Sequence, residues 1–373
     1  MKENLDILRS GKTGNIIVIS IILVLVVLSL FRLYPFENSL KDIVNGKDDW
    51  NRYARFALDI KHNGVLIKSV NGVYKGPGGF LYNYFVALCF LIFGENNIPI
   101  YIIQIVLLGF SIAFIYWTFR DKMNPFTGFA FLLTMFSFAL VDVYKNYSFR
   151  LLSENLGVFT VSLFFFFFIK GIEKNKLSFQ ICSAFFLVFS ILTRPNIFPF
   201  GLAFIIILIA FFLKQEKPYI LKSILFALFF LSGMSIIAFR NYIVCGSWTF
   251  LPTYGTSSVF ALTSHISLSY LLKKVLFCLG FLTTLNSEYL LRPHWVLMWI
   301  GYFIYIFLRI KDKTGFEIWE LTVHLFILLY YGLSIISLQI GSYGFRIFIP
   351  VIFIVLAFSF MAVDRLMKLN INS

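Results

Sequence analysis

Two adjacent carboxylates are the residues of this sequence with the clearest potential for catalysis. Asp48 and Asp49 lie in the segment Lys47-Asp48-Asp49-Trp50-Asn51-Arg52-Tyr53, among cationic and aromatic side chains. A carboxylate within hydrogen-bond reach of a hydroxyl group can act as the general base for its attack. The same residue types occur in ordinary solvated loops. On its own, the segment is therefore compatible with a loop that has no catalytic role or with a catalytic site.

A lysine beside a turn sequence follows in the same polar region, in Tyr74-Lys75-Gly76-Pro77-Gly78-Gly79. Glycine and proline favour a tight turn, and a lysine ammonium can meet a phosphate as a point charge. The glycines match no nucleotide-binding motif, so the segment indicates only that Lys75 can contact a phosphate.

Charged residues also lie at the boundaries of later apolar runs. These are Arg150, Glu154, Arg194, Arg240 and Arg346. Arg150 and Glu154 are four residues apart, so on a helix they would share a face and could form a local ion pair. An acid at the mouth of a membrane span is costly unless it is paired or functional. Each arginine alone could be an interface anchor, but together they predict an anion-binding site at one membrane face.

The elements that must position these residues are apolar helices. Apolar residues make up 59% of the 373 residues and charged residues 13%, against about 45–50% and 25% in soluble domains. Runs near twenty residues match a hydrocarbon core of about 30 Å. The predicted spans are 15–33, 98–119, 125–142, 154–169, 178–194, 196–213, 219–239, 294–309, 318–340 and 346–363. We therefore expect an all-α, polytopic transmembrane helix bundle.

Two shorter apolar stretches, 80–93 and 271–285, have a length typical of interfacial segments. If both stay outside the membrane, the basic loops 120–122, 170–176, 214–222 and 309–313 share one side with both termini, which predicts that this side is cytoplasmic. The bundle then has about ten spans, or up to about twelve if both stretches cross. Two large outer loops follow, at about 34–97 and 240–293, and 1–373 forms a single domain without repeats.

The net charge of +14 and the four scattered cysteines bear on whether the protein binds nucleic acid, binds zinc or is stabilised by disulfides. A positive-inside topology and contact with anionic membrane lipids explain the charge. The sequence has no basic and aromatic nucleic-acid module, so we expect no nucleic-acid partner. The cysteines form no C-x-x-C pair, which argues against a zinc cluster or a disulfide framework.

The order of these pieces resembles the GT-C superfamily of membrane glycosyltransferases, especially the PMT-like and ArnT-like enzymes that use dolichyl- or undecaprenyl-phosphate sugars. The matching pieces are Asp48-Asp49-Trp50 after the first span, Tyr74-Lys75-Gly76-Pro77, Ser153-Glu154-Asn155-Leu156, Thr193-Arg194-Pro195, Arg240-Asn241-Tyr242 and Phe345-Arg346. Gly76 interrupts the Lys-Pro-Pro-like sequence of the family.

This resemblance implies a GT-C-like bundle with outer juxtamembrane helices and an active site on the outer face of a bacterial or archaeal plasma membrane. An outer-loop aspartate, Asp49 or alternatively Asp48, would be the general base for a hydroxyl group of a glycan, lipid or protein acceptor. Glu154 would be a second acid that orients the acceptor or, with Asp49, a divalent metal ion; no other cofactor is implied. The substrate-binding residues would be Lys75, Arg150, Arg194, Arg240, Arg346 and Tyr53.

Two other functions would also place cations at the outer face. A transporter or flippase of lipid-linked sugars needs no chemistry, but such proteins usually carry polar residues near mid-membrane. The predicted spans are nearly free of charge at their centres, which favours an interfacial enzyme. A polysaccharide polymerase that uses lipid-linked repeat units would share the donor type and remains the other alternative.

Overall fold

A computed structural model describes residues 16, 19–24, 27, 49–66, 80–140, 150–194, 197, 199–213, 217–246, 248, 268–279, 292–312, 315–337 and 348–372. Throughout these residues the regular secondary structure is helical. The helices are α4 (Asp49–Asn63), α5 (Phe80–Phe93), α6 (Asn97–Phe119), the 3-10 helix η2 (Arg120–Lys122), α7 (Pro125–Phe138), α9 (Glu154–Glu173), α10 (Leu177–Thr193), α11 (Pro199–Leu213), α12 (Lys217–Cys245), α14 (Leu268–Cys278), α15 (Pro293–Lys311), α16 (Ile318–Ser337) and α17 (Ile349–Asn372).

The predicted spans from residue 98 onward each coincide with one of these helices, because a chain that leaves water must satisfy its backbone hydrogen bonds internally. In the described residues, five helical stretches are long and apolar enough to cross a membrane: 97–122, 154–173, 223–244, 293–311 and 349–369. Shorter apolar helices accompany them. The predicted all-α membrane bundle is therefore confirmed. Most of the predicted span 15–33 lies outside the described residues.

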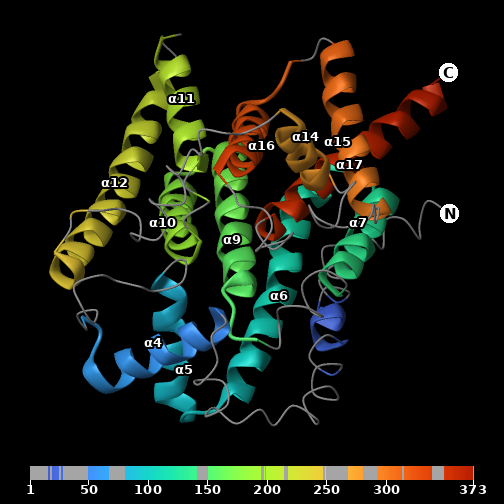
Figure 1. The fold of residues 1–373 in the computed structure, drawn as a ribbon. Coiled ribbons are helices and arrows are strands. Elements are labelled where there is room, and N and C mark those ends of the chain that lie inside the picture. The colour runs from blue at the N-terminus through green and yellow to red at the C-terminus, as the bar shows by residue number, and fades with distance from the viewer. Residues whose placement is uncertain are drawn as a thin grey trace.

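The interior of the bundle is built around α9, which packs against α6, α10, α16 and α17 (Figure 1). Phenylalanine rings join the helices there: the Phe200 ring meets those of Phe164 at 4.3 Å and Phe326 at 4.8 Å, both edge to face. Small residues bring other pairs closer, since a Cβ atom on Gly301 of α15 would lie 2.7 Å from Cβ of Ser359 on α17.

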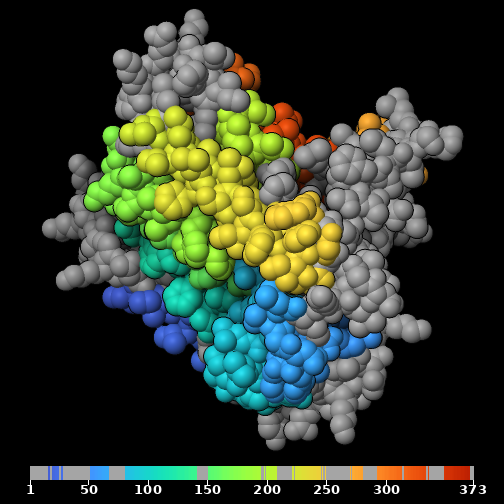
Figure 2. Space-filling view, turned by 90° about the vertical axis from the view of Figure 1, so that its left-hand side faces the viewer, coloured from blue at the N-terminus to red at the C-terminus, as the bar shows by residue number. Residues whose placement is uncertain are grey.

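Two elements lie at one end of this bundle and differ from the rest. Helix α4 carries charged residues and runs across that end, and the apolar α5 packs against it (Figure 1). In the space-filling view, α4 and α5 cover the surface below α12 (Figure 2). The predicted interfacial stretch 80–93 is thus a 14-residue helix. Of the stretch 271–285, residues up to 279 are described, and those to Cys278 belong to α14.

Candidate active site at one end of the bundle

A buried ion pair joins the start of α9 to the end of α10. The carboxylate of Glu154, the first residue of α9, has no exposed surface, and its Oε1 lies 3.1 Å from Nη1 of Arg194. Arg194 has extended backbone, with φ −143°, as expected for a residue that precedes a proline. Because two charges are costly to remove from water unless they are paired, this pair fixes the two helix ends relative to each other.

Gly157 provides the space for this arginine. A Cβ atom at Gly157 would lie 2.6 Å from Cδ of Arg194, closer than carbon atoms can approach. The Arg194 side chain therefore passes over the first turn of α9 where no side chain obstructs it.

The expected helical pairing of Arg150 with Glu154 is wrong. Helix α9 begins at Glu154, so Arg150 lies in the turn before the helix and does not share a helical face with the acid. The Arg150 side chain is exposed, while its backbone carbonyl accepts a hydrogen bond from Nε2 of Gln104 at 3.0 Å. The residue that meets Glu154 is forty positions later in the chain, where α10 returns to the same end.

Helix α4 is held at this end by a buried polar network. The Tyr53 hydroxyl donates to Oγ of Ser153, directly before Glu154, at 3.4 Å. The Tyr53 ring packs edge to face on Tyr82 at 4.8 Å, and the Tyr82 hydroxyl donates to Gln104 at 2.7 Å. Tyr53, Tyr82 and Gln104 are all buried. These contacts connect α4, α5 and α6 to the start of α9.

The network has a consequence for the aspartate pair. Asp49 is the first residue of α4, one helical turn before Tyr53, so the two positions share a face of the helix. Since Tyr53 contacts the residue next to Glu154, the first turn of α4 lies at the end of the bundle that contains the ion pair. Asp48 precedes the helix and lies outside the described residues.

Arg240, near the end of α12, is bound to α5 at the same end of the bundle. Its guanidinium lies 4.4 Å above the Phe80 ring, and its Nη2 donates to the Tyr84 hydroxyl at 3.0 Å. The same hydroxyl donates to the backbone carbonyl of Val65, just after α4, at 2.6 Å. Arg240 is therefore a stacked, positioned cation that links α12 to α5 and to the end of α4.

The structure thus brings Glu154, Arg194, Tyr53 and Arg240 to one end of the bundle, with Arg150 at the same end on the surface. Other predicted site residues, Lys75 and Arg346, lie outside the described residues, as does the side chain of Asp49.

Sequence reasoning missed the polar side chains that assemble this end. Gln104 is fully buried, and Nδ2 of Asn155 donates to its backbone carbonyl at 3.1 Å. A signal for Gln104 did exist, because it interrupts the otherwise apolar run 98–119. A polar group in such a run needs a partner inside the protein.

The acids described at this end do not form a metal cage by themselves. Within the described ranges, no group of three or more His, Cys, Asp or Glu side chains could hold a metal ion. Arg194 already compensates the charge of Glu154. A divalent ion bound there would therefore need Asp49 and substrate oxygens as further ligands.

The described residues thus form a helical bundle with membrane-spanning helices, and a buried acid, several cations and helix α4 lie at one end of it. Residues 76–237 match the family model of the dolichyl-phosphate-mannose-protein mannosyltransferases. The resemblance to PMT-like members of the GT-C superfamily is thereby confirmed, and the match supports a glycosyltransferase that uses a polyprenyl-phosphate sugar.

The matched segment includes Glu154, Gly157 and Arg194, while Asp49 precedes it and Arg240 follows it. No curated protein and no solved structure matches the chain significantly.

Proposed function

We propose that this protein transfers a sugar from a polyprenyl-phosphate donor to a hydroxyl group of a glycan, lipid or protein acceptor at the outer face of the membrane, with inversion of the anomeric centre. The observation that carries the proposal is the buried Glu154–Arg194 pair at the end of the bundle where α4 docks with Asp49 at its first position. The match to the mannosyltransferase family supports the type of donor.

The reaction needs one base and a set of cations. Asp49, or Asp48 in its place, accepts the proton of the acceptor hydroxyl as its oxygen attacks the anomeric carbon. The bond from that carbon to the phosphate oxygen breaks, and polyprenyl phosphate leaves with the electron pair. Attack from the side opposite the phosphate inverts the anomeric centre.

The cations stabilise the charge that grows on the departing phosphate. We assign this role to Arg240, Lys75 and Arg346, with Arg150 at the entrance. Arg240 already has the ring stacking that fixes a guanidinium plane in one orientation. Arg194 acts one step away, because it holds the Glu154 carboxylate in place.

Glu154 and Tyr53 complete the assignment. The Glu154 carboxylate positions the acceptor or, together with Asp49, a divalent ion, and the buried Tyr53 positions the site by docking α4 against Ser153. Metal dependence is tested by transfer assays after dialysis against a chelator. Activity that is lost and then restored by Mg²⁺ or Mn²⁺ supports the ion, whereas unchanged activity removes it from the mechanism.

The outer-face assignment is tested by cysteine labelling in intact cells, in a protein without its native cysteines. The exposed positions His62, at the end of α4, and Lys176, between α9 and α10, receive single cysteines. A membrane-impermeant reagent should label position 62 and leave position 176 unlabelled. Labelling of position 176 alone would place the site on the cytoplasmic side and contradict the proposal.

The chemistry is tested with Asp49→Asn in the purified protein. General-base loss typically lowers the rate by about 10²–10⁴, while binding of the lipid donor should change little because cations hold the phosphate. Asp48→Asn should lower the rate less. Asp59→Asn is the matched control, since Asp59 is an exposed acid on the same helix.

The products separate this proposal from the alternatives. Transfer of a single labelled sugar to an acceptor supports the proposed reaction. Movement of intact lipid-linked sugar across a liposome membrane without transfer would indicate a transporter, and chain growth would indicate a polymerase. Full transfer activity in Asp49→Asn, Asp48→Asn and the double variant would contradict the assigned base.

A further inference from the structure

The far end of the bundle contains a second concentration of charge that the proposed reaction does not use. A cavity of about 250 Å³ lies between η2, α15, α16 and α17. Four cations line it: Lys122, Arg309, Arg365 and Lys368. Helix α9 separates this end from the Glu154–Arg194 pair, because the helix begins with Glu154 at one end and finishes with Lys170 and Glu173 beside Lys122 and Asp121 at the other.

Each carboxylate that lines the cavity accepts a hydrogen bond or forms an ion pair with another group of the protein. Glu320 accepts from the Tyr305 hydroxyl, from the Arg309 guanidinium and from the backbone N–H of Glu317. Glu317 in turn accepts from Nε1 of Trp319 at 2.7 Å. The third acid of the lining, Asp364, accepts from the backbone and side chain of Asn124 and pairs with Lys368 at 2.6 Å.

The cations of the cavity keep donors in reserve. A guanidinium has five N–H donors and an ammonium has three. Arg365 meets Asp312 through Nη1 at 2.9 Å, and Lys368 meets Asp364 while its side chain is 62% exposed. Each can therefore donate to a further anion without breaking its existing contact.

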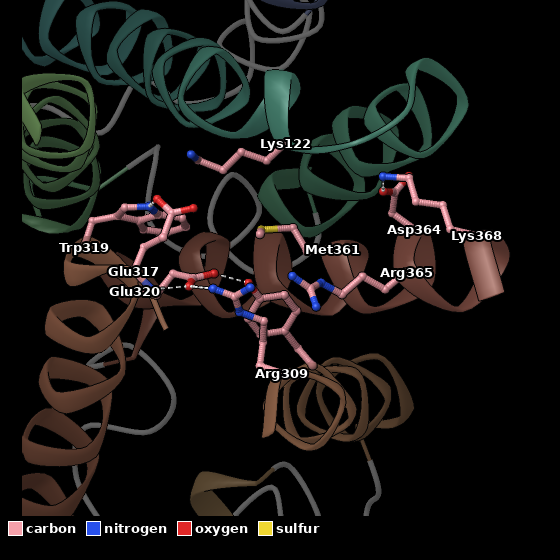
Figure 3. Close-up of a pocket in the computed structure, with 10 residues that line it drawn as sticks. Lys122, Arg309, Glu317, Trp319, Glu320, Met361, Asp364, Arg365 and Lys368 are labelled. Atoms are coloured by element: carbon pink, nitrogen blue, oxygen red, sulfur yellow. Dashed lines mark hydrogen bonds and ion pairs between the residues drawn. The ribbon is translucent and has the colours of Figure 1, made fainter. Parts of the chain in front are cut away.

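Aromatic rings orient two of the cations without using their N–H groups. The Lys122 ammonium lies 4.4 Å from the centre of the Trp319 ring, and the Arg365 guanidinium lies 5.5 Å from that of Tyr305. Figure 3 shows the Arg309 and Arg365 guanidinium groups at neighbouring positions beside the cavity, with Lys122 on its opposite wall. Cations that face a common space from two walls suit a tetrahedral oxyanion better than a planar carboxylate.

We propose that this cavity binds a phosphate group, supplied by the headgroup of an anionic membrane lipid. The same helices carry exposed apolar side chains that follow two of the lining arginines in the sequence, Ile310 on α15 and Leu366 on α17, against which acyl chains can lie. Tryptophan and tyrosine, which line the cavity, are the aromatic residues enriched at membrane interfaces. A bound lipid would join α15, α16 and α17 at the end opposite the active site.

The test measures lipid binding to the purified full-length protein by native mass spectrometry. The probes are phosphatidylglycerol, phosphatidylcholine and inorganic phosphate. Arg365→Gln/Lys368→Gln removes two cavity cations, and Lys176→Gln/Lys311→Gln removes two exposed lysines that do not line the cavity. We expect the cavity variant to bind phosphatidylglycerol about tenfold more weakly, about 1.4 kcal/mol, and the control variant to bind it like the wild type.

Several outcomes would overturn the proposal. Equal affinity of both double variants for phosphatidylglycerol would mean that the cavity is not the binding site. Equal binding of phosphatidylcholine and phosphatidylglycerol by the wild type would show that the cavity does not recognise an anionic headgroup. Competition by inorganic phosphate at a similar concentration would show that the ligand is a free anion and not a lipid. If the double variant does not fold, the single variant Arg365→Gln, whose partner Asp312 is exposed, serves in its place.

This inference is independent of the proposed reaction, because none of its variants touches the end of the bundle that contains Glu154. Sugar transfer by the cavity variant in detergent supplemented with phosphatidylcholine reports on the reaction alone. Loss of lipid binding with transfer retained supports two separate sites.

Discussion

Breaking the Glu154–Arg194 pair should destabilise the protein far more than an ordinary charge substitution. Arg194→Met keeps most of the side-chain volume but removes the guanidinium that lies 3.1 Å from a fully buried carboxylate. Removing one member of a buried pair typically costs about 3–5 kcal/mol. The favourable interaction of the Glu154 carboxylate with the positive end of the α9 dipole contributes only about 0.3–1 kcal/mol. It therefore cannot compensate for the loss of Arg194.

A second substitution should restore most of this stability. Glu154→Gln in the Arg194→Met background removes the buried negative charge as well, and replacing both members of a buried pair is often close to neutral. The double variant should therefore be more stable than Arg194→Met alone, although transfer activity should remain low in both. Gly157→Ala offers an independent perturbation, because its Cβ would occupy the path of Arg194 while both charges stay in place.

The assay is unfolding of the purified protein in a mild detergent, measured for the wild type, both single variants and the double variant. Arg150→Met is the matched control, since Arg150 is an exposed arginine at the same end, and surface substitutions usually change stability by less than about 0.5 kcal/mol. Additive effects of the two single substitutions, or an Arg194→Met variant as stable as the control, would refute the reasoning.

Three further predictions follow from contacts around the same site. Gln104→Leu should lower stability by about 1–3 kcal/mol for each buried polar group that it leaves unpaired, measured by the same unfolding assay, and unchanged stability would show that the network is dispensable. Arg240→Lys keeps the charge but loses the planar stacking and the two-point contact with Tyr84, so KM for the donor should rise several-fold with little change in folding; an unchanged KM would exclude donor contact. The hydrogen bond from Lys61 lowers the pKa of Glu95, so this contact stabilises the docked α4 at neutral pH and is lost as the pH falls through that lowered pKa. The stability difference between wild type and Glu95→Gln should therefore shrink as the pH falls from the ordinary range of a glutamate through the lowered pKa of Glu95, and vanish below it. A difference that is unchanged across this acidic range would contradict the assignment.

The sequence by itself determined the class of the fold and the ends at which charge gathers. Apolar runs such as 98–119 had to become helices, since a backbone without access to water pairs its polar groups within one segment. The same runs place Glu154 and Arg194 at helix ends, because a charge in the middle of a span is costly. Both constraints depend only on residues that are close in the sequence, so they can be predicted from the sequence.

Only the tertiary structure decided which of these charged residues meet. Spacing suggested Arg150 as the partner of Glu154, but α9 begins too late in the chain for that pairing, and the antiparallel return of α10 brings Arg194 instead. The anchoring of Tyr53 at Ser153 likewise joins segments one hundred residues apart. Such contacts depend on how helices pack, which is set by the volumes of many side chains at once and by gaps such as the one at Gly157.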